Sequence, residues 1–327
     1  MKNRRSMLTL GLISVLAASC GSTSSEETTD PYRLEMPFHD DFTILWLTDI
    51  HWGWSEDGTD YEKETLHLRG MIQEAKDNHK PDLMALTGDS FRNASQPQVS
   101  ELLDIIDSFD IPWAFTYGNH DTESFEAYQY FINDQIAKRK NKMFVDVKND
   151  NLTGLANYYI DLTSSSKVVY RLYLIDSNSY GGTGYDVIHS DQLDHLKKIY
   201  ATAKDQAPGL AFFHIPLTEY AAAYQGYQNG MYEGQGENGE AVCPPYTNNG
   251  AYDVLKDINV KACFCGHDHK NFSDVYYKNE MILSYGVKAT DLDYHTKGLY
   301  GYKIITLPQN SASLSIKNIQ MHYFLYQ

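Results

Sequence analysis

The chain has 327 residues, which is enough for one large α/β domain, or two small ones, with a sizeable core. Hydrophobic residues make up 42% and charged residues 21% of it, as is ordinary for a globular protein. The formal net charge of -16 argues against a nucleic-acid polymer as partner, because phosphate backbones are bound by clustered Lys and Arg. A small phosphate-bearing substrate stays open, since bound cations reverse the local charge.

The N-terminal residues 1–19 are predicted to be a signal peptide, with a basic start and the short apolar run MLTLGLISVLAA. The run ends in Ala-Ser-Cys-Gly, which resembles the lipobox of bacterial lipoproteins, where the cysteine, here Cys20, carries lipid. Simple secretion after cleavage near Ala18 or Ser19 is the alternative. We therefore expect an exported protein, anchored to the membrane through Cys20, in the periplasm or at the cell surface.

A tether and one catalytic domain are expected after the signal. Residues 20–38 include GSTSSEETTD, a stretch of small and acidic residues typical of a solvated tether. No internal repeat and no second linker follow. We therefore assign residues 39–327 to a single domain.

Short apolar runs alternate with segments of helical period in the first part of this domain. The predicted strands cover 42–49, 82–89 and 111–119, and the predicted helices cover 61–80, 98–109 and 123–140. Such alternation predicts a mostly parallel sheet flanked by helices.

The pattern changes in the second part of the domain. Strands are predicted at 157–162, 167–177, 209–214 and 260–266, with one helix at 189–206 and several short strands from about 274. The whole order fits an α/β fold of four layers, an α/β/β/α sandwich in which two mixed sheets pack face to face with helices outside.

Residues 224–250, rich in Gly, Asn and Tyr, interrupt the pattern. They are predicted to form a long ordered loop near the functional site. This loop either stacks on a ring of the substrate or is an ordinary exposed loop.

Polar residues able to bind metals follow five of the predicted strands. They are Asp49 with His51, Asp89, Asn119 with His120 and Asp121, His214, and His267 with His269. Taken alone, each cluster is typical of an ordinary turn or of a helix cap. Their shared position at strand ends, where sites of α/β sheets assemble, favours a polynuclear metal site.

The cysteines beyond Cys20 do not have the spacing of a zinc ribbon or a disulfide framework. Cys243, Cys263 and Cys265 are therefore predicted to be small apolar core residues.

The five polar blocks read D-x-H, G-D, G-N-H-D, H and G-H-x-H, and in this order they resemble the calcineurin-like metallophosphoesterase superfamily. GNHD and GHDH are the specific blocks. The resemblance runs from Asp49 to His269, and the segment GEAVCPPYTNNGAYDVL looks like a branch related to purple acid phosphatases. It implies the metallophosphoesterase fold, which is the four-layer sandwich described above.

The resemblance also implies a ligand set for two metal ions. One ion would be held by Asp49, His51, Asp89 and His269, and the other by Asp89, Asn119, His214 and His267. Asp89 would bridge them, because a carboxylate can join two cations about 3.5–4 Å apart. Nitrogen and oxygen ligands suit Fe, Zn or Mn, so two divalent or trivalent transition-metal ions are expected.

Two positions depart from the purple enzymes. Those enzymes have a tyrosine ligand three residues after the bridging Asp, where this chain has Arg92. They also lack the histidine that is present here as His51. We therefore predict no colour from a tyrosinate–iron pair.

The activity implied by the resemblance is metal-dependent hydrolysis of a small phosphoester, either a monoester or a diester. His120 is expected to protonate the leaving oxygen. Asp121 either orients a neighbouring histidine or begins the following helix, and Arg92 either contacts a substrate oxygen or is solvated.

The alternative function is that of a non-catalytic metal-binding homologue that acts as a binding or scaffold protein. A zinc peptidase is disfavoured because H-E-x-x-H does not occur. The oligomeric state and the substrate stay open.

Overall fold

The computed structural model describes residues 30–55, 59–123, 128–146, 152–182, 184–296 and 298–324. From Pro31 onward these residues form one compact unit. The predicted signal peptide and Cys20 lie outside the described residues. Within the described ranges, no helix is both long and apolar enough to cross a membrane.

The helices and strands follow one another in a mixed order. They are β1 (Arg33–Pro37), β2 (Phe42–Leu47), α1 (Tyr61–His79), β3 (Leu83–Thr87), α2 (Gln96–Asp107), β4 (Trp113–Thr116), α3 (Tyr128–Ala137), β5 (Tyr158–Ser164), β6 (Lys167–Leu174), β7 (Tyr180–Gly181), β8 (Gly184–Tyr185), α4 (Ser190–Thr202), β9 (Gly209–Phe212), α5 (Glu219–Gln228), β10 (Gly234–Gln235), α6 (Ala251–Asp257), β11 (Val260–Cys265), β12 (Asp274–Tyr277), β13 (Met281–Tyr285), β14 (Gly301–Leu307), two 3-10 turns (Ser311–Ser313 and Ile316–Asn318) and β15 (Ile319–Tyr323).

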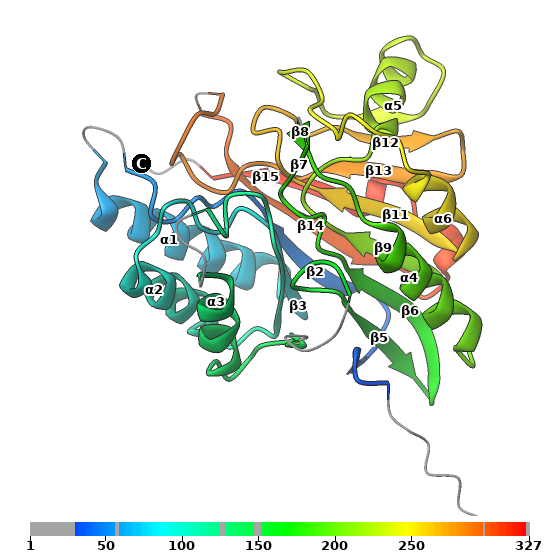
Figure 1. Ribbon diagram of the computed structural model, residues 1–327, viewed down its shortest axis with the longest axis horizontal. Helices are drawn as coiled ribbons and strands as arrows, with labels where there is room; N and C mark the ends of the chain where they lie inside the picture. Colours follow the sequence, from blue (N-terminus) through cyan, green and yellow to red (C-terminus); the bar gives the residue numbers. More distant parts are fainter. Residues whose placement is uncertain are drawn as a thin grey trace, which may run out of the picture. The chain divides into compact units, whose positions relative to one another are not determined.

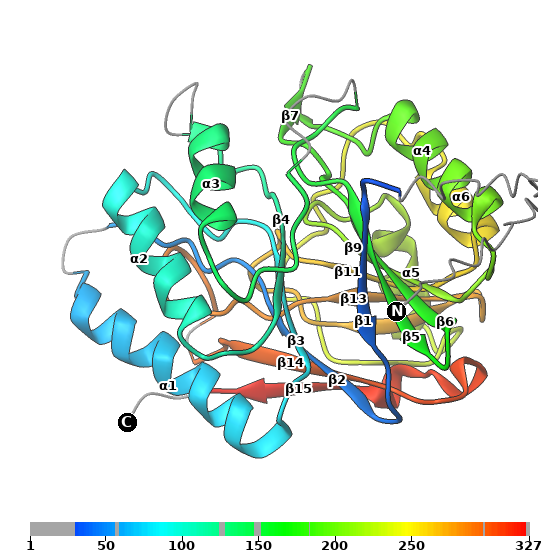
Figure 2. The same cartoon turned by 90° about the horizontal axis from the view of Figure 1, so that it is seen from below.

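Two mixed sheets form the centre of this unit. The larger has the strand order β1-β5-β6-β9-β11-β13-β12-β10, and the smaller has the order β15-β14-β2-β3-β4. Helices α1, α2 and α3 cover the outer face of the smaller sheet, and α4 and α6 cover that of the larger (Figures 1 and 2). The predicted α/β/β/α sandwich of two mixed sheets is confirmed.

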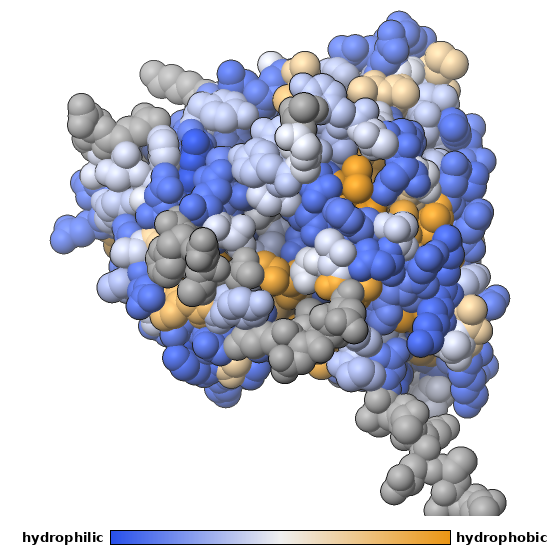
Figure 3. Space-filling model, in the orientation of Figure 1, coloured by the Kyte–Doolittle hydropathy of each residue, from blue (hydrophilic) through white to orange (hydrophobic). Residues whose placement is uncertain are grey.

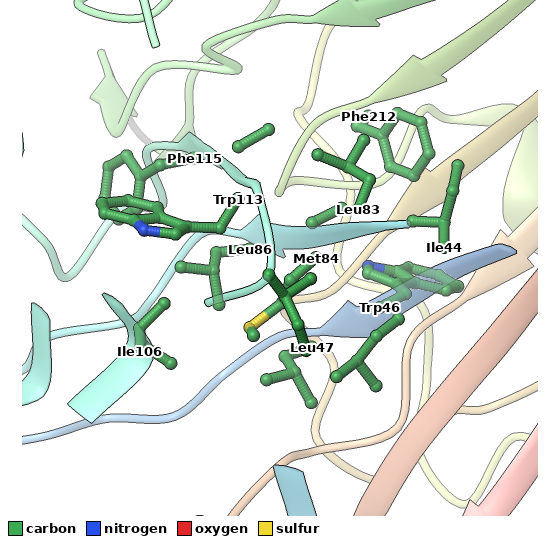
Figure 4. Packing of buried hydrophobic residues seen from close by; sticks show 14 of the residues in the cluster. Ile44, Trp46, Leu47, Leu83, Met84, Leu86, Ile106, Trp113, Phe115 and Phe212 are labelled. Carbon is green, nitrogen blue, oxygen red and sulfur yellow. The ribbon is translucent and has the colours of Figure 1, made fainter. Parts of the chain in front are cut away.

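The sequence of β2 shows why the sheets pack in this way. This strand lies between β14 and β3, and all of its residues, FTILWL, are buried. A strand covered on both faces reads as a continuous apolar run. Trp46 meets Phe264 of the larger sheet edge-on at 5.1 Å between ring centroids, and Phe264 stacks on Phe212 at 4.8 Å. Figure 4 shows Trp46 and Phe212 in this buried cluster.

Local signals fix the ends of the helices that cover the smaller sheet. The Asp60 side chain caps α1 by accepting hydrogen bonds from the amides of Glu62 and Lys63. The helix ends at Lys80, which has a left-handed backbone and is followed by Pro81. These ends agree with the predicted helix at 61–80.

The structure corrects the predicted boundaries at two places. Residues 33–37, predicted as tether, form the edge strand β1, which pairs in parallel with β5. Only Met36 of this strand is buried, so its apolar pattern is weak. The predicted loop at 224–250 is also shorter, because α5 continues to Gln228. Tyr220 and Ala223 lie on the buried side of this helix.

The face of the molecule in Figure 3 is hydrophilic over most of its area, and hydrophobic residues appear there only in small patches. Such a surface agrees with the acidic composition of the chain. The buried apolar residues lie between the layers instead.

Candidate metal centre

Five strands direct their carboxyl ends to one rim, where the two sheets meet. β2, β3 and β4 belong to the smaller sheet, and β9 and β11 belong to the larger. Within the smaller sheet, the amide of His51 donates to the carbonyl of Asp89 at 2.9 Å. Between the sheets, the amide of His267 donates to the Asp49 carboxylate at 3.1 Å. The polar residues that follow these strands are therefore brought together, as the strand order predicted.

Two groups of described residues could each hold a metal ion. Asp49, His51 and His269 form what we call the first half-site, and Asp89, His214 and His267 form the second half-site. The possible ligand atoms of each group lie within 4.8 Å of one another. All six side chains are buried.

Asp89 lies between the two half-sites. Its Oδ2 atom is 3.0 Å from His214 Nε2 in the second half-site and 3.7 Å from His51 Nε2 in the first. This position is the one that a bridging carboxylate requires.

Several buried atoms at the centre have no hydrogen-bond partner among the described residues. They are both ring nitrogens of His51, both ring nitrogens of His267, and Asn119 Oδ1. An unpartnered buried polar atom costs about 1–3 kcal/mol. A metal ion would satisfy one nitrogen of each of these neutral imidazoles and the Asn119 oxygen, and the nitrogen and oxygen donors suit Fe, Zn or Mn. The residues therefore fit the pair of metal ions that the resemblance implies.

Backbone carbonyls fix the orientation of two of the imidazoles. The Nδ1 atom of His214 lies 2.9 Å from the carbonyl oxygen of Thr87, and Nδ1 of His269 lies 2.9 Å from that of Tyr294. A carbonyl only accepts, so Nδ1 carries the proton in both rings. The Nε2 atom of each ring is then the one that can offer a lone pair to a metal, once it carries no proton.

The electrostatics of the second half-site depend on the pair formed by Asp89 and His214. Burial opposes both charges, yet the cation of His214 holds the pKa of Asp89 well below its ordinary value. In the same way, Asp89 outweighs burial and raises the pKa of His214 to about 10. Burial and the charge of His214 lower the pKa of His267 to about 3, so this third ring is neutral. Without metal, His214 is thus the protonated counter-ion of Asp89.

The first half-site is different, because its imidazoles are neutral. Burial lowers the pKa of His51 and of His269, and the nearby charge of Lys288 lowers both further. The Nζ atom of Lys288 donates to the carbonyl of Asp49 at 2.7 Å. These rings are therefore ready to bind a metal without losing a proton.

The backbone turns sharply as it leaves the strands. Asp49, His51, Asp89 and His267 all have positive φ, at 55°, 55°, 48° and 80°. Left-handed backbone at such residues costs about 1–3 kcal/mol each and collects at functional sites. Gly266 allows a close approach here, because a Cβ atom on it would lie 2.4 Å from Asp49 Oδ2.

His120 lies at the exposed edge of the centre, where 18% of its side chain is accessible. Its Nε2 atom is 4.0 Å from Asp89 Oδ2, and its Nδ1 atom is 2.6 Å from Glu123 Oε2. His120 is thus next to the half-sites without belonging to either group. Glu123 was not predicted, although its spacing of three residues from His120 is a signal that the sequence contains.

Asp121 ties the loops after β3 and β4 together. Its carboxylate accepts hydrogen bonds from the amides of Asp89 at 3.0 Å, Gly118 at 2.7 Å and Phe91 at 2.8 Å. The bonds of this carboxylate therefore go to the backbone of the site, whereas the sequence left a choice between a histidine partner and the start of a helix.

Arg92 forms an ion pair and is not directed at the metal ligands. Its guanidinium pairs with the carboxylate of Asp293 and lies 3.9 Å above the ring centroid of Trp54. Asp293 Oδ2 in turn faces His51 Nδ1 at 3.5 Å. The side chain of Arg92, which is 20% exposed, is therefore paired with a residue behind His51.

The segment 290–294 was not predicted as part of the site, yet it supports the first half-site. Thr290 Oγ1 donates to the carbonyl of Ile50 at 2.7 Å. Asp293 then faces His51, and the Tyr294 carbonyl accepts from His269. The Tyr294 ring also stacks on the His269 ring at 4.3 Å.

The loop that follows α5 is bound to the turn that carries His267 and His269. The amide of Cys243 donates to Asp268 Oδ2 at 3.2 Å, and the amide of Glu240 donates to Asn271 Oδ1 at 3.1 Å. Cys243 is exposed on this loop, so its prediction as a core residue is wrong. Cys263 and Cys265 are fully buried in β11, as predicted.

Tyrosines of the β7–β8 hairpin, rather than those of the loop, contact the metal centre. Tyr185 packs edge-on against His267 at 4.2 Å, and Tyr180 stacks on Tyr185 at 5.5 Å. The Tyr180 hydroxyl accepts a hydrogen bond from Asn119 Nδ2 at 3.3 Å, which turns Asn119 Oδ1 away from it. By contrast, Tyr232 of the loop packs on Tyr277 of the larger sheet.

Comparison with known proteins gives concordant results. Residues 42–271 match the family described as calcineurin-like phosphoesterase. Phosphatase DCR2 of Saccharomyces cerevisiae is 30% identical over 292 residues, which cover 79% of this chain but only 50% of that protein. Probable inactive purple acid phosphatase 28 of Arabidopsis thaliana is 30% identical over 282 residues, covering 73% of this chain and 68% of the relative. Probable inactive purple acid phosphatase 29 of the same plant is 28% identical over 345 residues, covering 92% and 85%.

A solved structure shares the fold. The dimetal phosphatase from Danio rerio superposes with a TM-score of 0.57 and 11% identity, over 88% of this chain and 100% of that one. The match of the family over most of the domain, together with the strand-end ligand blocks, shows that the chain belongs to the calcineurin-like phosphoesterase family.

Proposed function

We propose that this protein hydrolyses small phosphoesters at a pair of metal ions held by the first and second half-sites. One observation supports this more than any other. Two groups of buried metal-binding side chains, from the ends of four strands, lie on either side of the Asp89 carboxylate, and several of their ring nitrogens have no partner among the described residues. Asn119 completes the second half-site with its free Oδ1 atom.

The metal pair, when bound, supplies an activated water and positive charge for the phosphoryl oxygens. The chain's own residues donate the proton and position the metal ligands. His120, at the open edge of the centre, donates a proton from Nε2 to the oxygen of the leaving group. The Asp121 carboxylate holds the backbone of Asp89 and Gly118 in place by accepting hydrogen bonds from their amides. The metal ligands therefore need no rearrangement to bind the ions.

The donor atoms support Fe, Zn or Mn as the metals. Arg92 occupies the position of the purple enzymes' tyrosine and is bound to Asp293. We propose that the metal-loaded protein has no visible charge-transfer band. A band of that kind in the purified protein would contradict this assignment.

A non-catalytic metal-binding homologue is the alternative function, and the Arabidopsis relatives that are named probable inactive keep it open. The complete ligand set and the presence of His120 favour catalysis, because a site released from catalysis has no need for an acid next to the half-sites.

Metal analysis combined with a panel of chromogenic phosphomonoesters and phosphodiesters tests the proposal. We expect two metal ions per chain and turnover of at least one ester class. Replacement of His120 by Asn should lower turnover by about 10²–10⁴-fold with both metals retained. Two bound metals without turnover of any ester would favour the non-catalytic alternative.

We also propose that the protein is exported and anchored by lipid at Cys20. The basic start, the short apolar run and the Ala-Ser-Cys-Gly sequence support this proposal. Incorporation of labelled fatty acid by the wild type, and its loss in Cys20→Ala, would be the expected result. A mature N-terminus at a residue other than Cys20 would favour simple secretion.

A further inference from the structure

A chain of hydrogen bonds connects His120 to the β7–β8 hairpin. His120 Nδ1 lies 2.6 Å from Glu123 Oε2, and the other oxygen of Glu123 accepts from the Tyr180 hydroxyl at 3.1 Å. The same hydroxyl accepts from Asn119 Nδ2 at 3.3 Å. The four residues thus form one continuous network beside the second half-site.

This network determines which nitrogen of His120 faces the centre. A carboxylate can only accept, so Nδ1 carries the proton that is shared with Glu123. The Nε2 atom then points toward the half-sites, 4.0 Å from Asp89 Oδ2. The amide of His120 also donates to Asp89 Oδ1 at 2.8 Å, which fixes the backbone beneath the ring.

Glu123 is itself held in place by Tyr180. The Tyr180 hydroxyl bonds Glu123, while its ring stacks on Tyr185, which packs on His267. The hairpin therefore links the position of Glu123 to a residue of the second half-site. A mobile carboxylate would leave the imidazole free to rotate. Because Tyr180 restricts Glu123, the orientation of the His120 ring is restricted as well.

We propose that Glu123 is a positioning residue that holds His120 with Nε2–H directed at the leaving oxygen, and that Tyr180 holds Glu123. This inference rests on the proposed function, because it assigns a partner to the acid in that reaction. As water forms a new bond to phosphorus and the P–O bond to the leaving group breaks, the His120 imidazolium gives its Nε2 proton to the leaving oxygen. The ring becomes neutral and keeps its Nδ1–H on Glu123.

The leaving group of the substrate distinguishes a residue that positions His120 from one that only stabilises the fold. An ester with a good leaving group, such as dinitrophenyl phosphate, needs little help from an acid. An ester with a poor leaving group, such as phenyl or alkyl phosphate, depends on it. Loss of Glu123 should therefore slow the second kind of substrate far more than the first.

The test compares wild type, Glu123→Gln and Tyr180→Phe on aryl and alkyl phosphates of graded leaving-group basicity, with metal content measured in parallel. For Glu123→Gln we expect two metals, a loss of about 10–100-fold on the poorest leaving group, and less than about threefold on dinitrophenyl phosphate. Tyr180→Phe should change the rates in the same direction, by a smaller factor.

Asp82→Asn is the matched control, because Asp82 pairs with His39 at 2.9 Å just before β3 begins, at the opposite end of that strand from the metal centre. It should keep the leaving-group dependence of the wild type. An equal loss by Glu123→Gln on all substrates, no loss at all, or loss of a metal would each overturn the inference. If the wild type itself hydrolyses no ester, the proposed function fails instead.

Discussion

The two half-sites differ in what supports them. In the second, His214 is held by the carbonyl of Thr87, which belongs to the core strand β3. In the first, His51 and His269 are backed by Asp293 and by the carbonyl of Tyr294, from a segment between β13 and β14. The imidazole of His214 in the second half-site is thus held by a core strand, whereas those of the first half-site are held by a connecting segment. The two should therefore respond separately to changes in these supports, whereas changes at Asp89 should affect both.

Replacement of Asp89 should have the largest effect. Asp89→Asn removes the charge that lies between the half-sites, so we expect loss of at least one metal and a fall in turnover of about 10³-fold or more. Metal analysis and an ester assay measure both. Asp253→Asn, on the exposed side of α6, controls for the chemical change. A variant that keeps two metals and wild-type turnover would show that Asp89 does not bridge.

Replacement of Asp293 should affect the first half-site alone. Asp293→Asn removes the carboxylate that faces His51 Nδ1 and pairs with Arg92. Residues behind metal ligands typically change metal affinity by about 10–100-fold. Competition with a chelator should show one weakened metal and one unchanged metal. Asp194→Asn, at an exposed ion pair with Lys197 on α4, is the control, and equal weakening of both metals would contradict the separation.

The half-sites should also differ in how pH changes their affinity. The pKa of His214 is raised to about 10, so metal must displace a proton from the second half-site at neutral pH. His51 and His269 have lowered pKa values and are already neutral. Affinity of the second half-site should therefore rise by up to about tenfold per pH unit between pH 7 and 9, while that of the first changes little.

Calorimetry in two buffers of different ionisation enthalpy measures this proton release. About one proton should leave with the metal of the second half-site. Uptake of both metals without proton release at pH 7.5 would be inconsistent with a protonated His214.

Replacement of Tyr185 should have the smallest effect. This ring packs edge-on against His267, both of whose nitrogens have no partner among the described residues. Tyr185→Ala should lower affinity at the second half-site by a few-fold, since an aromatic contact contributes about 0.5–1.5 kcal/mol. Tyr185→Phe keeps the contact and should behave as the wild type. Loss of affinity in Tyr185→Phe would point to the hydroxyl instead.

The sequence was sufficient to predict the sandwich and the convergence of the ligand residues, for a physical reason. Strand β2 is a continuous apolar run followed at once by Asp49 and His51, and β11 is followed in the same way by His267 and His269. Parallel strands place their carboxyl ends at one rim. Residues that directly follow such strands in the sequence can therefore be predicted to lie close together.

The supports of the ligands could not be predicted in the same way. His214 and His269 are fixed by the carbonyls of Thr87 and Tyr294, and every residue has a carbonyl. The hairpin of Tyr180 and Tyr185 consists of two-residue strands, too short for an alternating pattern. Strand β1 buries only Met36, so its sequence lacks the apolar run that predicts a strand. It nevertheless pairs with β5.

Anomalous diffraction from crystals of the metal-loaded protein tests the central claim most directly. We expect two peaks about 3.5–4 Å apart, one among Asp49, His51 and His269 and the other among Asp89, His214 and His267, with Asp89 in contact with both. A single peak, or two peaks that do not share Asp89, would contradict it.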